Sequence, residues 1–554
     1  MKKLTLKTAT MKQLKTIIIT AITTVFYFLP SFGGVGGGGA YAQVAGAPYI
    51  VPAPEEEESC PFTTEGRDFW VTFLRATEND FFGIIDPGFF LKITTGNLAA
   101  DVTLTFTEGG ANSVFNYHIN GYSAEFIDLS KMPLGGATFI DKRSAVRPIP
   151  NGGIPTPPKS QKTLHITSTT PVSVYAFNTG QATTDATIVM PVPAWGMNYY
   201  MLGYRAFGVN SDEIIIAATN GTTLSLVNDI ANTTTPIMDG ANPLILNRGD
   251  VYYTRSDING DLTGRHITSN YPVAYFTHSE MSQIPFGYPA GDILWEQLSP
   301  VDSWGKTFLV PNTLEYNNSG NNIGNHIRII ASENNTKVEY FSGAIPVTTY
   351  NDGITDIPGD TPIGSGGILQ AGQWFELEIP RSGSNSCFIK ADKAVGVAAY
   401  MTGKGGVPGQ GYGDPAITRI PAIDQLTPDV TVSPFLFPTL SSSFQTTLDE
   451  PGARHFMIII APTASKDNIS VITSSGAVTL DPNQWIDNPD TANPVTNPGG
   501  TAMSYYDYEF EISNDPNKAF NVIGPDGVIV LAYGIYPAES YYYNAGSGAC
   551  VINP

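Results

Sequence analysis

The chain has 554 residues, of which 42% are hydrophobic and 14% are charged, and it holds 56 glycines and 42 prolines. This composition is typical of many short strands joined by tight turns and excludes a mainly helical protein. The formal net charge of −21 disfavours nucleic acid and anionic lipid as partners, because both bind to basic faces.

Residues 1–42 have the features of an export signal. Lysines precede the apolar stretch 17–30, and Ala40 and Ala42 occupy the small positions of an A-x-A cleavage site before Gln43. Removal of this segment takes away five lysines and no acid, which leaves 24 basic and 50 acidic residues and a net charge of −26. We expect a protein that is secreted or held at the cell surface, with no segment inserted in the membrane.

Residues 43–65 are rich in proline and carry four consecutive glutamates, which is typical of an extended linker. Beyond it, one apolar phrase recurs four times: "LHITSTTPVSVYAF" (164–177), "HITSNYPVAYF" (266–276), "FIKADKAVGVAAY" (388–400) and "FNVIGPDGVIVLAY" (520–533). Ahead of each copy, the alternation of apolar and polar residues predicts an opening strand, a hairpin and one further strand.

The recurrence predicts an all-β protein of four repeated antiparallel units, at about 66–190, 191–300, 301–423 and 424–545, followed by a C-terminal tail at 546–554. One such unit seldom buries both of its faces, so neighbouring units should pack on one another. A propeller-like closed ring is favoured over tandem β-sandwiches, because a ring hides the edges of every sheet.

Three cysteines bear on whether the units close into a ring or form tandem β-sandwiches. Cys60 precedes the first unit and Cys550 follows the fourth, so a closed ring would bring them together and a disulfide could join them. Cys387 would then be left as a buried thiol at the head of a strand. The alternative is three free thiols.

Six segments are informative in their order and spacing: "GRDFWVTFLR" (66–75), "KTLHITSTTPVSVYAFNTGQATTDATIVMPV" (162–192), "WGMNYYMLGYR" (195–205), "EQLSPVDSWGKTFLVP" (296–311), "HIRIIASENNTKV" (326–338) and "YGIYPAESYYYNAG" (533–546). Together they resemble the N-terminal domain of the IgG Fc-binding protein family. The resemblance covers nearly all of residues 66–545. It implies a secreted or surface module in adhesion or mucus-like matrices, and the family's distribution suggests a bacterial member from the Bacteroidetes. No antibody-binding residue is carried over, because no motif defines one.

One acidic position recurs after each apolar phrase, in the order Asp185, Asp292, Asp414 and Glu539. Four carboxylates at equivalent places would lie on one face of a ring, where they could bind calcium or cap a turn. Because each unit needs the same turn, we expect the structural role.

A second candidate for calcium is the segment 257–264, in which Asp257, Asn259 and Asp261 alternate as in calcium loops. The bidentate glutamate of such loops is missing, and a hairpin turn is the alternative. Calcium is thus the one cofactor considered, and no other is expected.

The histidines give no clear catalytic pattern. His165 and His266 open two copies of the phrase, whereas the other two copies have apolar residues there, so we expect packing roles. His278 and Glu280 form a looser pair, and no zinc motif or nucleophile elbow occurs. We therefore predict no enzyme but a binding or adhesion module for an extracellular glycoprotein, mucin or polysaccharide. The alternatives are a glycan-cleaving hydrolase or lyase on a β scaffold, and a structural component of a surface layer or appendage.

Overall fold

The computed structural model describes the following residues: 63–74, 88–106, 113–129, 133–134, 137–138, 159–180, 183–288, 290–313, 324–346, 367–380, 386–403, 413–437, 452–510, 517–536 and 539–549. All of them belong to the second of two compact parts, Glu58–Pro554, and the first part is Met1–Glu57. The predicted export signal and nearly all of the predicted linker lie outside the described residues. Within the described ranges no helix is both long and apolar enough to cross a membrane.

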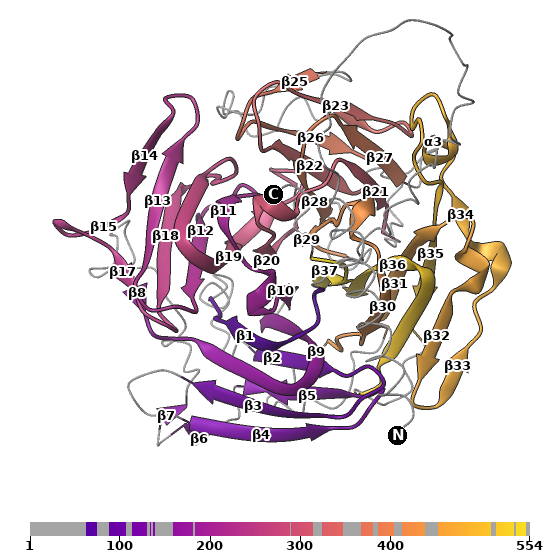
Figure 1. Ribbon diagram of the computed structural model, residues 1–554, viewed down its shortest axis with the longest axis horizontal. Helices are drawn as coiled ribbons and strands as arrows, with labels where there is room; N and C mark the ends of the chain where they lie inside the picture. The colour runs from indigo at the N-terminus through magenta and orange to yellow at the C-terminus, as the bar shows by residue number, and fades with distance from the viewer. Residues whose placement is uncertain are drawn as a thin grey trace, which may run out of the picture. The chain divides into compact units, whose positions relative to one another are not determined.

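The predicted all-β class is confirmed, since almost every described element is a strand and all the strand pairs are antiparallel (Figure 1). Each copy of the apolar phrase forms one long strand or two short ones: β9 (Leu164–Gly180), β19 (His266–Gln283), β27 (Ser386–Ala391) with β28 (Val395–Met401), and β36 (Phe520–Tyr536). β-Branched and aromatic residues favour this extended backbone, and in the third copy a bend at 392–393 divides the strand.

One pairing pattern occurs around each of these long strands. The first half pairs with an opening strand: β1 (Gly66–Val71), β11 (Gly196–Tyr200), β21 (Thr307–Pro311) or β30 (Thr427–Val432). The second half pairs with a closing strand: β10 (Thr183–Val189), β20 (Gly291–Leu298), β29 (Ala416–Arg419) or β37 (Glu539–Gly546). We refer to each such set as a repeat.

A hairpin in each repeat pairs with both halves of the long strand. The hairpins are β2 (Gly88–Thr94) with β3 (Ala100–Phe106), β12 (Asn210–Ala217) with β13 (Thr222–Asn228), β22 (His326–Ala331) with β23 (Thr336–Tyr340), and β31 (Arg454–Pro462) with β32 (Ser470–Thr473). Their turns use the expected residues, since Gly221 and Asn335 have φ values of 80° and 60°.

A middle strand follows each hairpin and pairs with its first strand: β5 (Ala124–Asp128), β18 (Val251–Ile258), β26 (Trp374–Glu378) and β35 (Met503–Glu509). The remaining elements lie at sheet edges or in connections: β4 (Ser113–Ile119), β6 (Pro133–Leu134), β7 (Ala137–Thr138), β8 (Lys159–Ser160), β14 (Thr233–Pro236), β15 (Met238–Asp239), β16 (Asn242–Pro243), β17 (Ile245–Leu246), β24 (Ile345–Pro346), β25 (Gly367–Leu369), β33 (Gly476–Val478), β34 (Ile486–Asp487) and the short helix α3 (Pro489–Ala492).

The closing strands gather at the centre of the described strands (Figure 1). Contacts join β10 to β20, β20 to β29, β29 to β37, and β37 to β10. Nearly every residue of these strands is buried. The described strands hydrogen-bond into several separate antiparallel sheets, so the closed ring stays a prediction.

A short 3₁₀ turn precedes three of the opening strands, at Val192–Ala194, Val301–Ser303 and Ile423–Gln425. A glycine of the preceding repeat lies against each turn. A Cβ atom on Gly66 would lie 2.3 Å from Pro191 Cβ, and one on Gly196 would lie 2.3 Å from Pro300 Cβ. These glycines therefore leave the space in which the next repeat begins.

The first and fourth repeats also meet. Thr63 and Gly548 form an isolated antiparallel bridge, and the N–H of Thr64 donates to the carbonyl of Ser547 at 3.0 Å. The rings of Phe177 in the first repeat and Phe435 in the fourth stack with centroids 3.8 Å apart. The two ends of the described chain are thus joined by backbone pairing, and aromatic packing also joins the first repeat to the fourth.

We expect Gly196→Ala to lower the free energy of unfolding by about 1–3 kcal/mol, the usual cost of overpacking, because its Cβ would overlap Pro300. Denaturant unfolding measures this change. Gly96→Ala is the matched control, since its Cβ would have only Thr431 Oγ1 within 4 Å, at 3.6 Å. Equal loss in both variants would contradict the proposed role of the glycine.

Cys60 and Cys550 lie outside the described residues, whereas Cys387 is a buried free thiol. The bridge between Thr63 and Gly548 lies three residues after Cys60 and two before Cys550 in the sequence, and the disulfide stays a prediction. We expect the intact mass of residues 43–554 to rise by two hydrogens on reduction, with one cross-linked peptide in the non-reduced digest. In the chain-entropy model a loop of this length contributes about 6 kcal/mol. Three alkylatable thiols in the denatured, unreduced protein would contradict the prediction.

Candidate functional site

The four recurrent acids lie inside the protein. Asp185, Asp292 and Glu539 are on closing strands and Asp414 precedes β29, and each is at most 4% exposed. Carboxylates this deeply buried need hydrogen-bond donors. The donors to Asp185, Asp292 and Glu539 are backbone N–H and hydroxyl groups, many of them from a neighbouring repeat.

Alternate side chains of β10 accept hydrogen bonds from alternate N–H groups of β20. In donor–acceptor order the bonds run from Ile293 to Thr183 Oγ1 (3.2 Å), from Trp295 to Asp185 Oδ2 (2.9 Å), and from Gln297 to Thr187 Oγ1 (2.8 Å). The opposite edge of β20 pairs with β19, so these three N–H groups have no strand beside them. The side chains of β10 therefore take the place of a neighbouring strand.

The contact is reciprocal. The N–H of Thr184 donates to Asp292 Oδ1 at 2.9 Å, and the hydroxyl of Thr183 donates to the same oxygen. Asp292 also accepts from the N–H of Ile293 at 2.7 Å. One carboxylate oxygen thus serves two strands.

Similar bonds connect the other closing strands. The N–H of Arg419 on β29 donates to Glu296 Oε1 at 3.1 Å, and the N–H of Asp414 donates to Ser540 Oγ on β37 at 2.7 Å. The hydroxyl of Thr184 donates to Glu539 Oε2 at 3.4 Å. Hydrogen bonds that involve side chains therefore connect the closing strands in the same order as their contacts, from β10 through β20, β29 and β37 back to β10.

Burial raises the pKa of Asp185 well above its ordinary value, and the N–H groups of Trp295 and Ala186 that donate to the carboxylate oppose this rise. Across the described ranges, no group of three or more His, Cys, Asp or Glu side chains could hold a metal ion. The arrangement is suited to joining strands.

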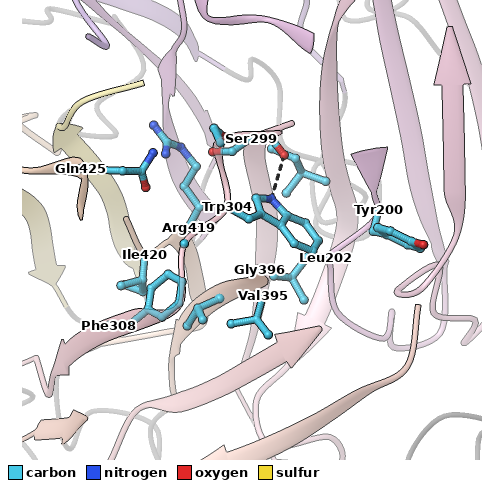
Figure 2. Close-up of a pocket in the computed structure, with 14 residues that line it drawn as sticks. Tyr200, Leu202, Ser299, Trp304, Phe308, Val395, Gly396, Arg419, Ile420 and Gln425 are labelled. Carbon is cyan, nitrogen blue, oxygen red and sulfur yellow. Dashed lines mark hydrogen bonds between the residues drawn. The ribbon is translucent and has the colours of Figure 1, made fainter. Parts of the chain in front are cut away.

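A small cavity lies beside this region, where the second and third repeats meet the start of the fourth (Figure 2). Its volume is about 30 Å³, which is room for roughly two water molecules. Trp304, whose indole N–H donates to the carbonyl of Ser299 at 3.2 Å, lines it together with Arg419 and Gln425. The cavity is too small for a sugar ring.

The segment predicted as a calcium loop has other partners. Asp261 Oδ1 accepts from the N–H of Thr263 at 2.9 Å, and Asp261 Oδ2 lies 2.6 Å from Arg328 Nη1. Asn259 Oδ1 accepts from the N–H of Gly208 at 2.6 Å, and Asp257 is exposed. Calcium binding here stays a prediction, but the oxygens of Asp261 already have partners.

Arg328 is fully buried and joins the second repeat to the third. Its guanidinium lies between the rings of Tyr204 and Trp374, with centroids 4.0 and 4.2 Å from Cζ, and its Nε is 2.8 Å from Glu376 Oε2. Arg328 thus pairs with Asp261 of the second repeat and with Glu376 of the third. The sequence analysis missed this cluster, because no motif marks a pair 67 residues apart.

The paired histidines of the apolar phrase stack on aromatic residues of the opening strands. His165 lies 4.1 Å from the Trp70 ring and pairs with Asp68 at 2.8 Å. His266 lies 4.0 Å from the Tyr200 ring and pairs with Asp229 at 2.9 Å. Both positions pack one strand on the next.

His278 and Glu280 have separate partners. His278 Nδ1 is 2.8 Å from Asp212 Oδ2, and both side chains are fully buried. Glu280 instead pairs with Arg255 at 2.9 Å. Desolvation raises the pKa of Glu280. Arg255 Nε also lies 3.4 Å from Asp212 Oδ1, so the two residues of the predicted pair belong to one network of charged groups inside the second repeat.

These features define an all-β repeat protein whose buried charged groups connect its own strands. The IgGFc binding protein family model matches residues 185–534, so the chain belongs to that family and the predicted resemblance is confirmed at this level.

Among curated proteins, the human (Homo sapiens) IgGFc-binding protein is 22% identical over 386 residues, which cover 69% of this chain and 6% of the human protein. Among solved structures, a tetra-tandem repeat in the extending region of a large adhesion protein aligns over 82% of this chain and 92% of that chain. Its identity is 9% and its TM-score is 0.08, which is too low to support a shared fold.

We expect Asp261→Asn to lower the free energy of unfolding by about 1.5–3 kcal/mol, the range for a hydrogen bond to a charged group, because Arg328 keeps only Glu376 as a carboxylate partner. Denaturant unfolding with and without calcium measures the change. Asp257→Asn, at an exposed position of the same segment, is the control and should have little effect. A loss seen in both variants and only with calcium would contradict the assignment of Asp261 to Arg328.

Proposed function

We propose that this chain is a secreted or cell-surface bacterial module that binds an extracellular glycoprotein, mucin or polysaccharide. The observation that carries the proposal is membership of the IgGFc-binding family over residues 185–534. The human relative is named for binding the Fc part of IgG, and this chain spans 6% of its length.

The proposal includes a propeller-like closed ring of the four repeats. Its support is the order of contacts from β10 through β20, β29 and β37 back to β10, together with the backbone bridge between Thr63 and Gly548. A ring of this kind protects the sheet edges and directs loops and outer strands toward solvent.

The internal use of the reactive side chains also favours binding over catalysis. His165 and His266, which pair with Asp68 and Asp229, stack on aromatic rings. In the pairs of His278 with Asp212 and His326 with Glu376, all four side chains are at most 2% exposed. A substrate would need to reach them from solvent. We therefore assign recognition to the surface.

The test combines a binding measurement with a turnover assay on residues 43–554. The immobilised ligands are IgG Fc and mucin, each before and after enzymatic removal of glycans, and a set of bacterial polysaccharides. We expect saturable binding to at least one ligand without release of reducing ends. Heat-unfolded protein is the control for non-specific adsorption.

Each other outcome points away from the proposal. Release of reducing ends would favour a glycan-cleaving enzyme, and absence of binding together with self-assembly in light scattering would favour a structural component. Among binding outcomes, loss after removal of glycans would identify the glycan as the recognised part, and unchanged binding would identify the protein.

A further inference from the structure

Glu296 stands where three repeats meet. It lies on β20 of the second repeat and is fully buried. Its Oε2 accepts a hydrogen bond from the hydroxyl of Thr187 on β10 at 2.9 Å, and its Oε1 accepts from the N–H of Arg419 on β29 at 3.1 Å. One carboxyl group therefore bonds to the first, second and third repeats.

The charged groups that face Glu296 come from the two neighbouring closing strands. Arg419 Nε on β29 lies 4.0 Å from Glu296 Oε1, and Asp185 on β10 interacts with it electrostatically. On β19 the opposite residue is Thr277, which carries no charge. Burial raises the pKa of Glu296 to about 8, although Arg419 and the hydrogen bonds act to lower it.

The hydrogen bonds around Glu296 can satisfy both of its protonation states. Thr187 Oγ1 lies 2.9 Å from Glu296 Oε2 and 3.2 Å from the carbonyl of Ile188, and it accepts from the N–H of Gln297. When Glu296 is ionised, the Thr187 hydroxyl donates to it. When Glu296 is protonated, its own O–H can donate to Thr187, whose hydroxyl then turns to Ile188.

We propose that Glu296 is a proton-dependent contact among the first three repeats, neutral in the folded protein at neutral pH and ionised, with loss of stability, in alkaline solution. The inference concerns regulation of the scaffold and does not depend on the proposed ligand. The direction of the pH dependence follows from the linkage between proton binding and folding. In the unfolded chain Glu296 ionises near its ordinary value of 4.5, so its stabilising effect is complete below that pH. The effect is lost as the pH rises through about 8.

The test compares denaturant unfolding of the wild type and Glu296→Gln from pH 5 to pH 9. Between the two ionisation steps the folded wild type holds about one more proton at this site. Its unfolding constant should therefore rise about tenfold more per pH unit than that of the variant. Other buried acids, such as Asp507 and Glu65 with pKa values raised to about 7, should contribute equally to both. Glu333→Gln, at a residue whose side chain is 61% exposed, is the control, and its unfolding constant should depend on pH as that of the wild type does.

A second variant keeps the proposal testable if Glu296→Gln does not fold. Thr187→Val removes the hydroxyl that stabilises the ionised form, so the step in stability should move to higher pH. The proposal would be overturned if the unfolding constant of Glu296→Gln rose with pH as steeply as that of the wild type. It would also be overturned if Thr187→Val lost stability at the same pH as the wild type.

Discussion

The structure depends on one constraint, which is that every N–H group of a buried strand needs an acceptor. Each closing strand pairs with a long strand on one edge only, and its other edge is buried against another repeat. On β20 this edge is completed by Thr183, Asp185 and Thr187 of β10. The polar residues at the centre are therefore a structural requirement of packing separate sheets together.

The same constraint explains why side chains capable of chemistry, such as Asp185, Glu296 and Arg328, are buried inside the protein. Asp185 and Glu296 accept backbone N–H groups across repeat boundaries, and Arg328 connects two repeats through carboxylates and aromatic rings. Unpaired buried charges are costly, so each of these groups is tied to a partner in another repeat. This internal use of polar groups, together with membership of a binding family, supports the proposed assignment of recognition to the outer surface.

The sequence predicted the all-β class and the recurrence of strands, because both follow from local alternation and turn residues. It also marked Asp185 and Asp292 as equivalent acids, although their partners were out of reach of local patterns. Thr183 and Thr187 flank Asp185 at every second position of β10, and this row of polar residues was a usable signal of side-chain acceptors. The pair of Arg328 with Asp261 had no such signal, since it depends on how two repeats pack.

Amide hydrogen exchange along β20 tests the central claim most directly. The account predicts that the N–H groups of Ile293, Trp295 and Gln297 exchange as slowly as the intervening ones that pair with β19, because both sets open only when the repeats separate. Fast exchange of these three groups, at the rate of an exposed sheet edge, would contradict it.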